Sequence, residues 1–304
     1  MAWFPEEDEC VSAVRIDETP SPAELDLLLR LLDDETAEVR KHVSERLTKT
    51  SGDLSDWLAA RDKPLGAKDK ALLSALLAPA RRATLERDWQ APSTGLAALD
   101  DDWDSCEALL RQISDFLHDG VSVRQSLSDA LDLLAEEAEA NESLTPLKLR
   151  KFLFDGGRFK GNSGHYDDPR NSDLAWCIAE GTSNPIGLCL IFLLVARRLD
   201  IEVQPINNPG HFLCRIHEDG YPIIIDCFNA GAIHLQMTLL EDPDLTKRQR
   251  DIYLSTAPAG DVVIRVLNNL INALDQAMRP EDAGTIRAIR KSLSDGIDDE
   301  DLPF

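Results

Sequence analysis

The sequence has few basic residues for its size. Lys and Arg number 32 against 55 Asp and Glu in 304 residues, which gives a formal net charge of −23. Binding to a nucleic-acid duplex depends on basic side chains that displace the counterions of the phosphates, and binding to anionic membrane surfaces depends on the same charges. The sequence also has no long Lys/Arg run. We therefore expect neither a nucleic-acid partner nor a membrane partner.

Long apolar runs and paired cysteines are also missing. The longest apolar stretch, 186–196, has about 11 residues, whereas a membrane span needs about 20. The first nine residues lack the basic and apolar regions of a signal peptide, so none is expected there. The cysteines are scattered without a C-x-x-C pair, at Cys10, Cys106, Cys177, Cys189, Cys214 and Cys227. This usage favours reduced thiols and a cytoplasmic location.

Signatures of metals and cofactors are absent too. His211, His217 and His234 lack the i, i+4 helical spacing of a zinc pair, and no cysteine pair accompanies them. No G-x-G-x-x-G lies between a strand and a helix, so a dinucleotide is not expected. The prediction is therefore no metal and no cofactor.

Apolar residues recur at helical spacing on both sides of the middle of the chain. Apolar stripes over 25–32 and 39–47 predict two antiparallel helices with a turn at 33–36. This unit resembles one HEAT repeat, although a generic helical bundle fits equally well. Further helices are expected at 71–77, 102–117, 123–138, 144–154, 262–278 and 284–293. We expect a helical domain over 1–95, ending in a possible linker at 91–97, and C-terminal helices with an acidic tail over 256–304.

The middle of the chain has a different pattern. Residues 156–183 are rich in Gly, Asn, Asp and Ser, which predicts a long functional loop. An apolar helix follows to residue 199, with Asn184 as N-cap and Pro185 at the first helical position, and it is expected to be buried. A strand at 203–206 and a hairpin come next. With strands at 211–216 and 221–226 and a loop at 217–220, His211 lies opposite Asp226, whose carboxylate would orient the imidazole.

Several motifs lie between residues 159 and 270. They are YDDPRNS at 166–172, NPIGL at 184–188 with ARRL at 196–199, PGHFL at 209–213, IDCFN at 225–229, FKGN at 159–162 and LNNL at 267–270. Together they resemble the transglutaminase-like superfamily, and in particular its bacterial SirB-type branch, over about 145–275. The resemblance implies a papain-like α+β core. The expected fold is α+β and mostly helical, with this core and its preceding helices over 96–255 and an antiparallel sheet within it.

The resemblance also implies a Cys-His-Asp triad, with the nucleophile at the start of the buried helix in active members. Counting back from Arg197 places that position at Pro185, which has no nucleophilic group. The nearest thiol, that of Cys189, lies one turn further on, about 6 Å along the helix axis. The field of the helix terminus fades within the first turn. We therefore interpret Cys189 as a small buried apolar side chain.

Three functions remain open at this point. The first is a non-catalytic transglutaminase-like protein, a pseudoenzyme that binds a protein, peptide or small ligand in a cleft around His211 and Asp226. The second is a cysteine-dependent acyl-transferase or hydrolase with Cys189 as nucleophile, His211 as base and Asp226 as orienting group. The third is a helical scaffold with a relic core. The changed nucleophile position favours the first.

Five further side chains are candidates for ligand binding. They are Asp168, Arg170, Asn171, Asn184 and Asn229. An arginine offers a planar fork that binds a carboxylate through two hydrogen bonds. The alternative for Asp168 and Arg170 is an internal ion pair that pins the loop.

Overall fold

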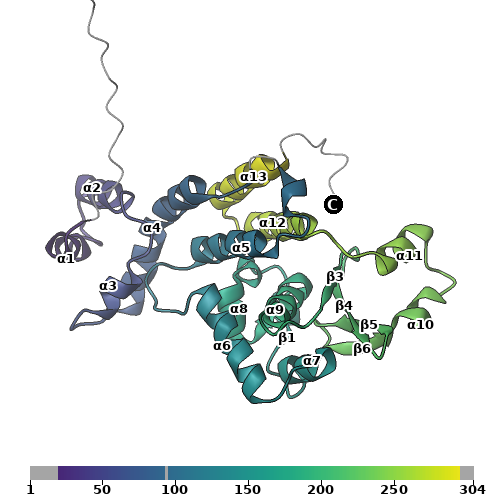
Figure 1. Cartoon of the computed structure of the whole chain (residues 1–304). Coiled ribbons are helices and arrows are strands. Elements are labelled where there is room, and N and C mark those ends of the chain that lie inside the picture. The colour runs from purple at the N-terminus through teal and green to yellow at the C-terminus, as the bar shows by residue number, and fades with distance from the viewer. Residues whose placement is uncertain (1–19, 93–94, 295–304) are drawn as a thin grey trace, which may run out of the picture. The chain divides into compact units, whose positions relative to one another are not determined.

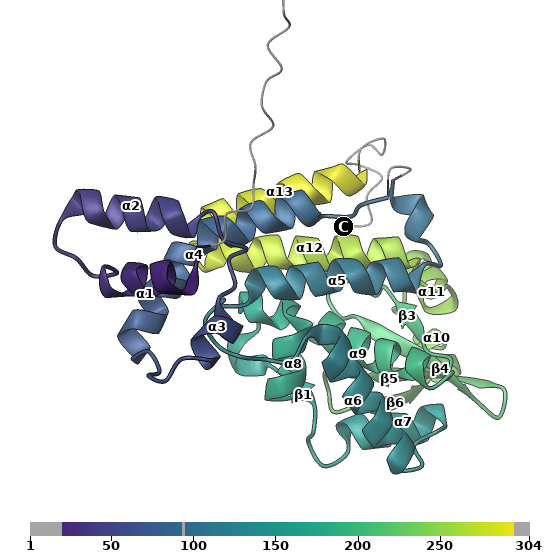
Figure 2. The ribbon, with the colours of Figure 1, turned by 60° about the vertical axis from the view of Figure 1, so that its left-hand side comes forward.

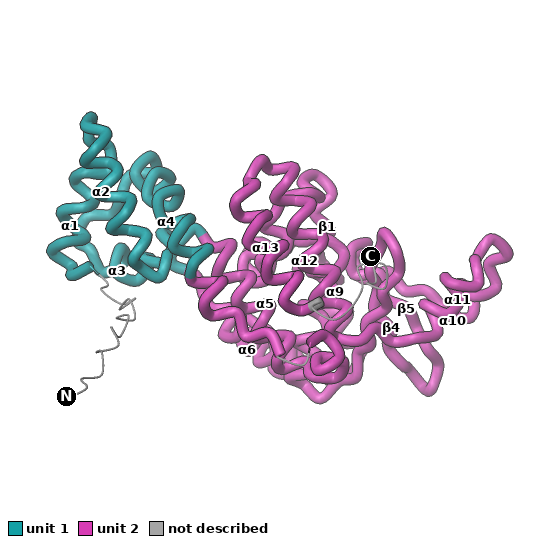
Figure 3. Tube along the Cα trace, turned by 90° about the horizontal axis from the view of Figure 1, so that it is seen from above, with its two compact units in different colours: residues 1–83, 119–123 teal, residues 84–118, 124–304 magenta. Residues whose placement is uncertain are grey.

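The computed structural model describes residues 20–92 and 95–294, and the chain divides into two compact units (Figure 3). Unit 1 comprises residues 1–83 and 119–123, and unit 2 comprises residues 84–118 and 124–304. The division falls inside a helix, and the domain boundary expected at 95–96 stays a prediction. Cys10, the first nine residues and the acidic tail after residue 294 lie outside the described residues.

Unit 1 is helical, as its apolar periodicity predicts. It contains α1 (Pro22–Arg30), α2 (Ala37–Leu47), α3 (Ser55–Ala59) and the first part of α4 (Ala67–Asp88). The Ser21 hydroxyl caps α1 by accepting a hydrogen bond from the Glu24 N–H at 3.3 Å. Arg46, near the end of α2, donates to the Glu24 carboxylate at 3.1 Å, so the two helices are antiparallel (Figure 2). The likeness of this pair to a HEAT repeat stays a prediction.

Unit 2 is built around one buried helix, α9 (Pro185–Arg198), in which every residue from 185 to 196 is buried. The expectation from its apolar sequence is thus confirmed. It contacts α6, α7 and α8 and the strands β3 and β4 (Figure 1). The surrounding helices are α5 (Trp103–Leu117), α6 (Leu127–Ala140), α7 (Pro146–Phe154), α8 (Leu174–Glu180), α12 (Ala259–Gln276) and α13 (Pro280–Ser294), with a 3-10 turn at η1 (Leu96–Leu99). No helix in the described part of the chain is long and apolar enough to span a bilayer.

A four-stranded antiparallel sheet completes the α+β fold. Its order is β3 (Gln204–Ile206), β4 (Leu213–Glu218), β5 (Tyr221–Asp226) and β6 (Ala232–Leu235). The hairpin is present, but the predicted loop at 217–220 is wrong. His217 and Glu218 belong to β4 and pair with Pro222 and Tyr221. The turn is only the dipeptide at 219–220.

The physical reason for this error is the turn chemistry. Asp219 and Gly220 have φ values of 50° and 79°, and Asp-Gly is a favoured pair where both central residues of a hairpin turn need positive φ. The register therefore moves by two residues, which keeps each side chain on its predicted face. Continued by one pair, the register sets Asp226 opposite Leu213, so His211 lies just before β4.

The region 156–183 contains more regular structure than expected. It holds the parallel pair β1 (Lys160–Gly161) and β2 (Thr182–Ser183), the 3-10 turns η2 (Ser163–His165) and η3 (Pro169–Ser172), and the helix α8. Asp173 caps α8 by accepting from the Trp176 N–H at 3.1 Å, and Gly181 ends it with φ of 66°. An N-cap aspartate and a C-terminal glycine with seven residues between them were the available signal. Two further short helices, α10 (Gln236–Leu240) and α11 (Lys247–Leu254), were also not predicted.

Candidate functional site

The structure brings His211 and Asp226 together. His211 lies in the segment between β3 and β4, and Asp226 ends β5. The His211 Nε2 is 2.8 Å from the Asp226 Oδ1, and the side chains are 32% and 10% exposed. The buried Nε2 nevertheless makes no hydrogen bond, so this contact has the distance of one but not its direction. The carboxylate thus lies in direct contact with the imidazole.

Asn229 positions this carboxylate from the turn that follows β5. Its backbone N–H donates to the Asp226 Oδ1 at 3.1 Å, and its side-chain amide donates to the Oδ2 at 2.8 Å. Both carboxylate oxygens therefore have fixed partners. Asn229 thus positions Asp226, and its expected contact with a ligand stays a prediction.

Cys189 is packed into the core. Its side chain is 1% exposed, and its thiol donates to the Phe212 carbonyl at 3.6 Å. The sulfurs of Cys189, Cys214 and Cys227 all lie within 4.8 Å of one another. Burial raises the pKa of both Cys189 and Cys227. Burial also opposes ionisation of Cys214, but hydrogen bonds from the other two sulfurs lower its pKa. A protonated, shielded Cys189 lacks the activated thiolate that covalent catalysis needs.

Asn184 and Asn171 have structural partners. The Asn184 Oδ1 accepts from the Gly187 N–H at 2.9 Å and so caps α9. The Asn171 amide donates to the carbonyls of His165 and Tyr166, both at 2.9 Å, and its side chain is buried. These contacts hold the α9 terminus and the Tyr166 loop, which are two walls of the cleft described below.

Asp168 and Arg170 form an internal ion pair, the alternative left open by the sequence. The Arg170 Nη2 lies 2.6 Å from the Asp168 Oδ2, and its guanidinium stacks over the Trp176 ring at 4.7 Å. Burial alone would raise the pKa of Asp168, but hydrogen bonds and the charge of Arg170 hold it below its ordinary value. The fork of Arg170 is therefore already engaged by a carboxylate.

A cavity of about 260 Å³ opens at the N-terminal end of α9. It is lined by Tyr166, Pro185, Ile186, Pro209, Gly210, Phe212, Arg265 and Asn269. A second hollow of about 370 Å³ shares Tyr166 and Asn269 with it and continues along α12. We call these two hollows the Tyr166 cleft. Tyr166 and His211 both contact the ring of Phe228 edge-on, at 5.9 and 6.0 Å between ring centroids, so the histidine lies beside the cleft.

Arg265 is the basic side chain of the first cavity. It donates to the Asn208 carbonyl at 2.8 Å and to the Asn207 side chain, and it packs over the Phe212 ring at 5.2 Å. Within the described ranges, none of its hydrogen-bond partners is a carboxylate. Burial lowers the pKa of Arg265 without bringing it near neutrality, so the guanidinium stays charged. A cation without an acidic partner is available to an anionic ligand.

Sequence reasoning overlooked Arg265 and Asn269. They stand four residues apart on α12, a spacing that places both on one helix face. Polar residues at this spacing within a mainly apolar helix were the available signal. Only the fold shows that this face meets the start of α9.

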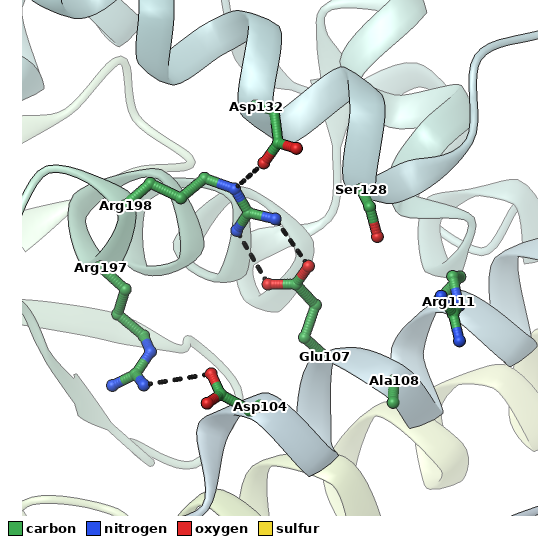
Figure 4. Close-up of a pocket in the computed structure, with 8 residues that line it drawn as sticks. All are labelled: Asp104, Glu107, Ala108, Arg111, Ser128, Asp132, Arg197 and Arg198. Atoms are coloured by element: carbon green, nitrogen blue, oxygen red, sulfur yellow. Dashed lines mark hydrogen bonds and ion pairs between the residues drawn. The ribbon is translucent and has the colours of Figure 1, made fainter.

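A hollow of about 390 Å³ lies at the other end of α9 (Figure 4). Arg197 and Arg198, two of its arginines, already have acidic partners. Arg198 makes two hydrogen bonds to Glu107, at 2.7 and 2.8 Å, and one to Asp132 at 2.6 Å. Arg197 pairs with Asp104 at 3.5 Å. These two arginines differ from Arg265 in the first cavity of the Tyr166 cleft, which has no carboxylate among its hydrogen-bond partners in the described ranges.

Comparisons with known proteins point to the same part of the chain. Residues 121–268 match the family model described as the transglutaminase-like superfamily. The chain is 34% identical to a UPF0162 protein of Xylella fastidiosa (strain 9a5c) over 161 residues, which are 46% of this chain and 56% of that protein. It is 23% identical to UPF0162 protein PA3419 of Pseudomonas aeruginosa over 204 residues, 63% of this chain and 67% of that protein.

A shorter similarity connects the chain to a eukaryotic protein. F-box only protein 21 of Mus musculus is 34% identical over 77 residues, which are 25% of this chain and 12% of that protein. The chain spans about half the length of the first curated relatives it matches. No solved structure gives a significant match.

Proposed function

We propose that the transglutaminase-like domain at 121–268 is non-catalytic and binds a peptide or small ligand with an anionic group in the Tyr166 cleft. The observation that carries this proposal is Pro185. It stands where the resemblance places the nucleophile, and it lines the cleft near His211 and Asp226. The base and its orienting carboxylate are thus retained beside a binding cavity that lacks their thiol.

The anionic character of the ligand follows from Arg265. Its guanidinium faces a cavity at the positive end of the α9 dipole, where Ile186 carries the first main-chain N–H of the helix because Pro185 has none. A carboxylate bound there would receive charge-assisted hydrogen bonds, which are about twice as strong as neutral ones. The apolar walls of Phe212 and Pro185 would pack against the remainder of the ligand.

Assignment to the SirB-type branch and to the cytoplasm is part of the same proposal. The similarity to bacterial UPF0162 proteins supports a bacterial branch of the superfamily. The five cysteines in the described part of the chain are free thiols, which suits a reducing compartment.

Binding is tested with a set of short peptides that have a free C-terminal carboxylate and with the same peptides amidated. We expect the carboxylate forms to bind, as measured by calorimetry, and the amidated forms to bind at least tenfold more weakly. Arg265→Gln should weaken binding by about 10- to 100-fold, since hydrogen bonds to charged groups contribute about 1.5–3 kcal/mol. Arg197→Gln, at the opposite end of α9, is the matched control and should bind like the parent. Absence of binding, or equal binding by Arg265→Gln, would refute the proposal.

Alkylation of Cys189 separates this function from a cysteine enzyme. We expect native Cys189 to resist iodoacetamide until the protein unfolds, because the thiol is buried and protonated. Mass spectrometry of the parent and of His211→Ala follows the reaction between pH 5 and 9. Rapid alkylation below pH 7 that His211→Ala abolishes would overturn the non-catalytic assignment and support acyl transfer or hydrolysis through Cys189.

A further inference from the structure

Three cysteines that are distant in sequence meet in the core of unit 2. Cys189 lies in the second turn of α9, Cys214 in β4, and Cys227 directly after β5. Each is at most 1% exposed, and the three sulfurs lie within 4.8 Å of one another. Backbone contacts hold them, since the Cys214 thiol donates to the Cys189 carbonyl at 3.8 Å. The proposed ligand binding does not use this cluster, which we call the three-thiol cluster, and the alternative cysteine mechanism involves only Cys189 of the three.

The separation of the sulfurs is close to that of a metal–thiolate centre. A zinc–thiolate bond of about 2.3 Å places three sulfurs around one ion about 4 Å apart. The three-thiol cluster therefore needs movements of less than about 1 Å to surround an ion. It supplies sulfur alone, a donor set that selects soft ions such as copper(I) and zinc over magnesium, calcium or manganese.

Coordination number distinguishes among soft ions. Zinc in structural sites takes four ligands, whereas this cluster supplies three. Copper(I) is a soft ion that cysteine sulfur selects. Each cysteine that becomes a ligand gives its thiol proton to the solvent, R–SH + M⁺ → R–S–M + H⁺, because the thiolate and not the thiol binds the metal.

We propose that Cys189, Cys214 and Cys227 form a buried binding site for copper(I). The cluster is connected to the His211–Asp226 pair through the backbone, because Cys227 directly follows Asp226 and the Cys189 thiol donates to the carbonyl of Phe212, the residue after His211. The inference stands independently of the Tyr166 cleft, which uses other side chains.

The test is an anaerobic titration of the full chain with copper(I) presented by a chromogenic bidentate chelator. We expect the chain to withdraw one copper ion from the chelator and its melting temperature to rise, because an ion bound only by the folded state stabilises it. Cys214→Ser should weaken copper binding by at least 100-fold. Cys106→Ser and Cys177→Ser, which change buried cysteines outside the cluster, are matched controls and should bind like the parent, as should Cys10→Ser.

X-ray absorption at the copper edge of the loaded parent protein does not depend on any variant folding. We expect three sulfur neighbours and no nitrogen or oxygen neighbour. The proposal is overturned by a failure to withdraw copper, by binding that a control variant abolishes, by nitrogen in the coordination shell, or by one-to-one zinc binding with no copper binding. Nitrogen in the coordination shell would mean that the three sulfurs serve as core packing. Zinc binding without copper binding would mean that they form a site for a divalent ion.

Discussion

Replacing Gly187 by alanine tests the packing that positions the start of α9. Gly187 is the residue whose N–H bonds to the N-cap Asn184, so it lies at the wall of the Tyr166 cleft. A Cβ added there would lie 2.1 Å from the Ser183 Oγ and 3.0 Å from the Asn171 carbonyl oxygen. Ser183 is fully buried, and its hydroxyl donates to that same carbonyl at 2.8 Å. The serine must therefore move.

The magnitude follows from three terms. Overpacking of a core costs about 1–3 kcal/mol. A displaced Ser183 leaves the buried Asn171 carbonyl without its hydroxyl partner, at a cost of about 1–3 kcal/mol. Alanine is favoured over glycine in a helix by about 1 kcal/mol. We expect Gly187→Ala to lower the free energy of unfolding by about 1–5 kcal/mol.

Urea denaturation of the parent, Gly187→Ala, Ser183→Ala and the double variant measures this effect. Without the serine hydroxyl, the Ser183 Cβ remains at 3.1 Å from the added Cβ and the closest clash is gone. The double variant should recover at least about 1 kcal/mol relative to additivity. Gly284→Ala is the matched control, because that exposed helical glycine has no atom within 4 Å of an added Cβ and should gain stability. Equal stability of Gly187→Ala and Gly284→Ala would refute the reasoning.

Two other ion pairs give further predictions. Arg124 lies 2.6 Å from the carboxylate of Asp173, whose side chain is 3% exposed. Arg124→Met should therefore lower the free energy of unfolding, measured by urea denaturation, by about 3–5 kcal/mol. A loss below about 1 kcal/mol would contradict the argument from burial. The pKa of Asp168 is lowered in the folded state, so its stabilising effect is complete above the ordinary carboxyl pKa and is lost as the pH falls through the folded value. Asp168→Asn should therefore be less stable than the parent at pH 6, and the difference should shrink below about pH 4; a difference that stays constant down to pH 2 would show that the charge is not responsible.

Local chemistry explains which elements could be predicted. The cap at Ser21, the apolar stripes of α1 and α2, and the all-round apolar α9 each depend on residues within a few positions, and all three match the structure. The contact between His211 and Asp226 also followed from the hairpin, since a register shift of two residues preserves the faces. The Asp219-Gly220 turn and the capped helix α8 were missed in the prediction, although the sequence contains the signals for both.

Other features depend on distances that no local pattern encodes. Asn171 and Asn229 make internal hydrogen bonds, because burial and the neighbouring loops decide what a polar side chain meets, and their expected ligand contacts stay predictions. Arg265 lies about 80 residues in sequence from Pro185, yet both line one cavity. Contacts between residues this far apart depend on how helices and strands pack against one another. The sequence of a single segment does not specify that packing.

The cysteines show the difference most directly. Their scattered spacing alone determined that no local metal motif exists, and the apolar helix around Cys189 predicted that this thiol would be buried. Only the packing of α9 against β4, which pairs with β5, decided that three of them share one small volume. Sequence periodicity specifies which face of a helix or strand is apolar, whereas tertiary packing specifies which apolar faces meet. The three-thiol cluster and the Tyr166 cleft both arise from tertiary packing.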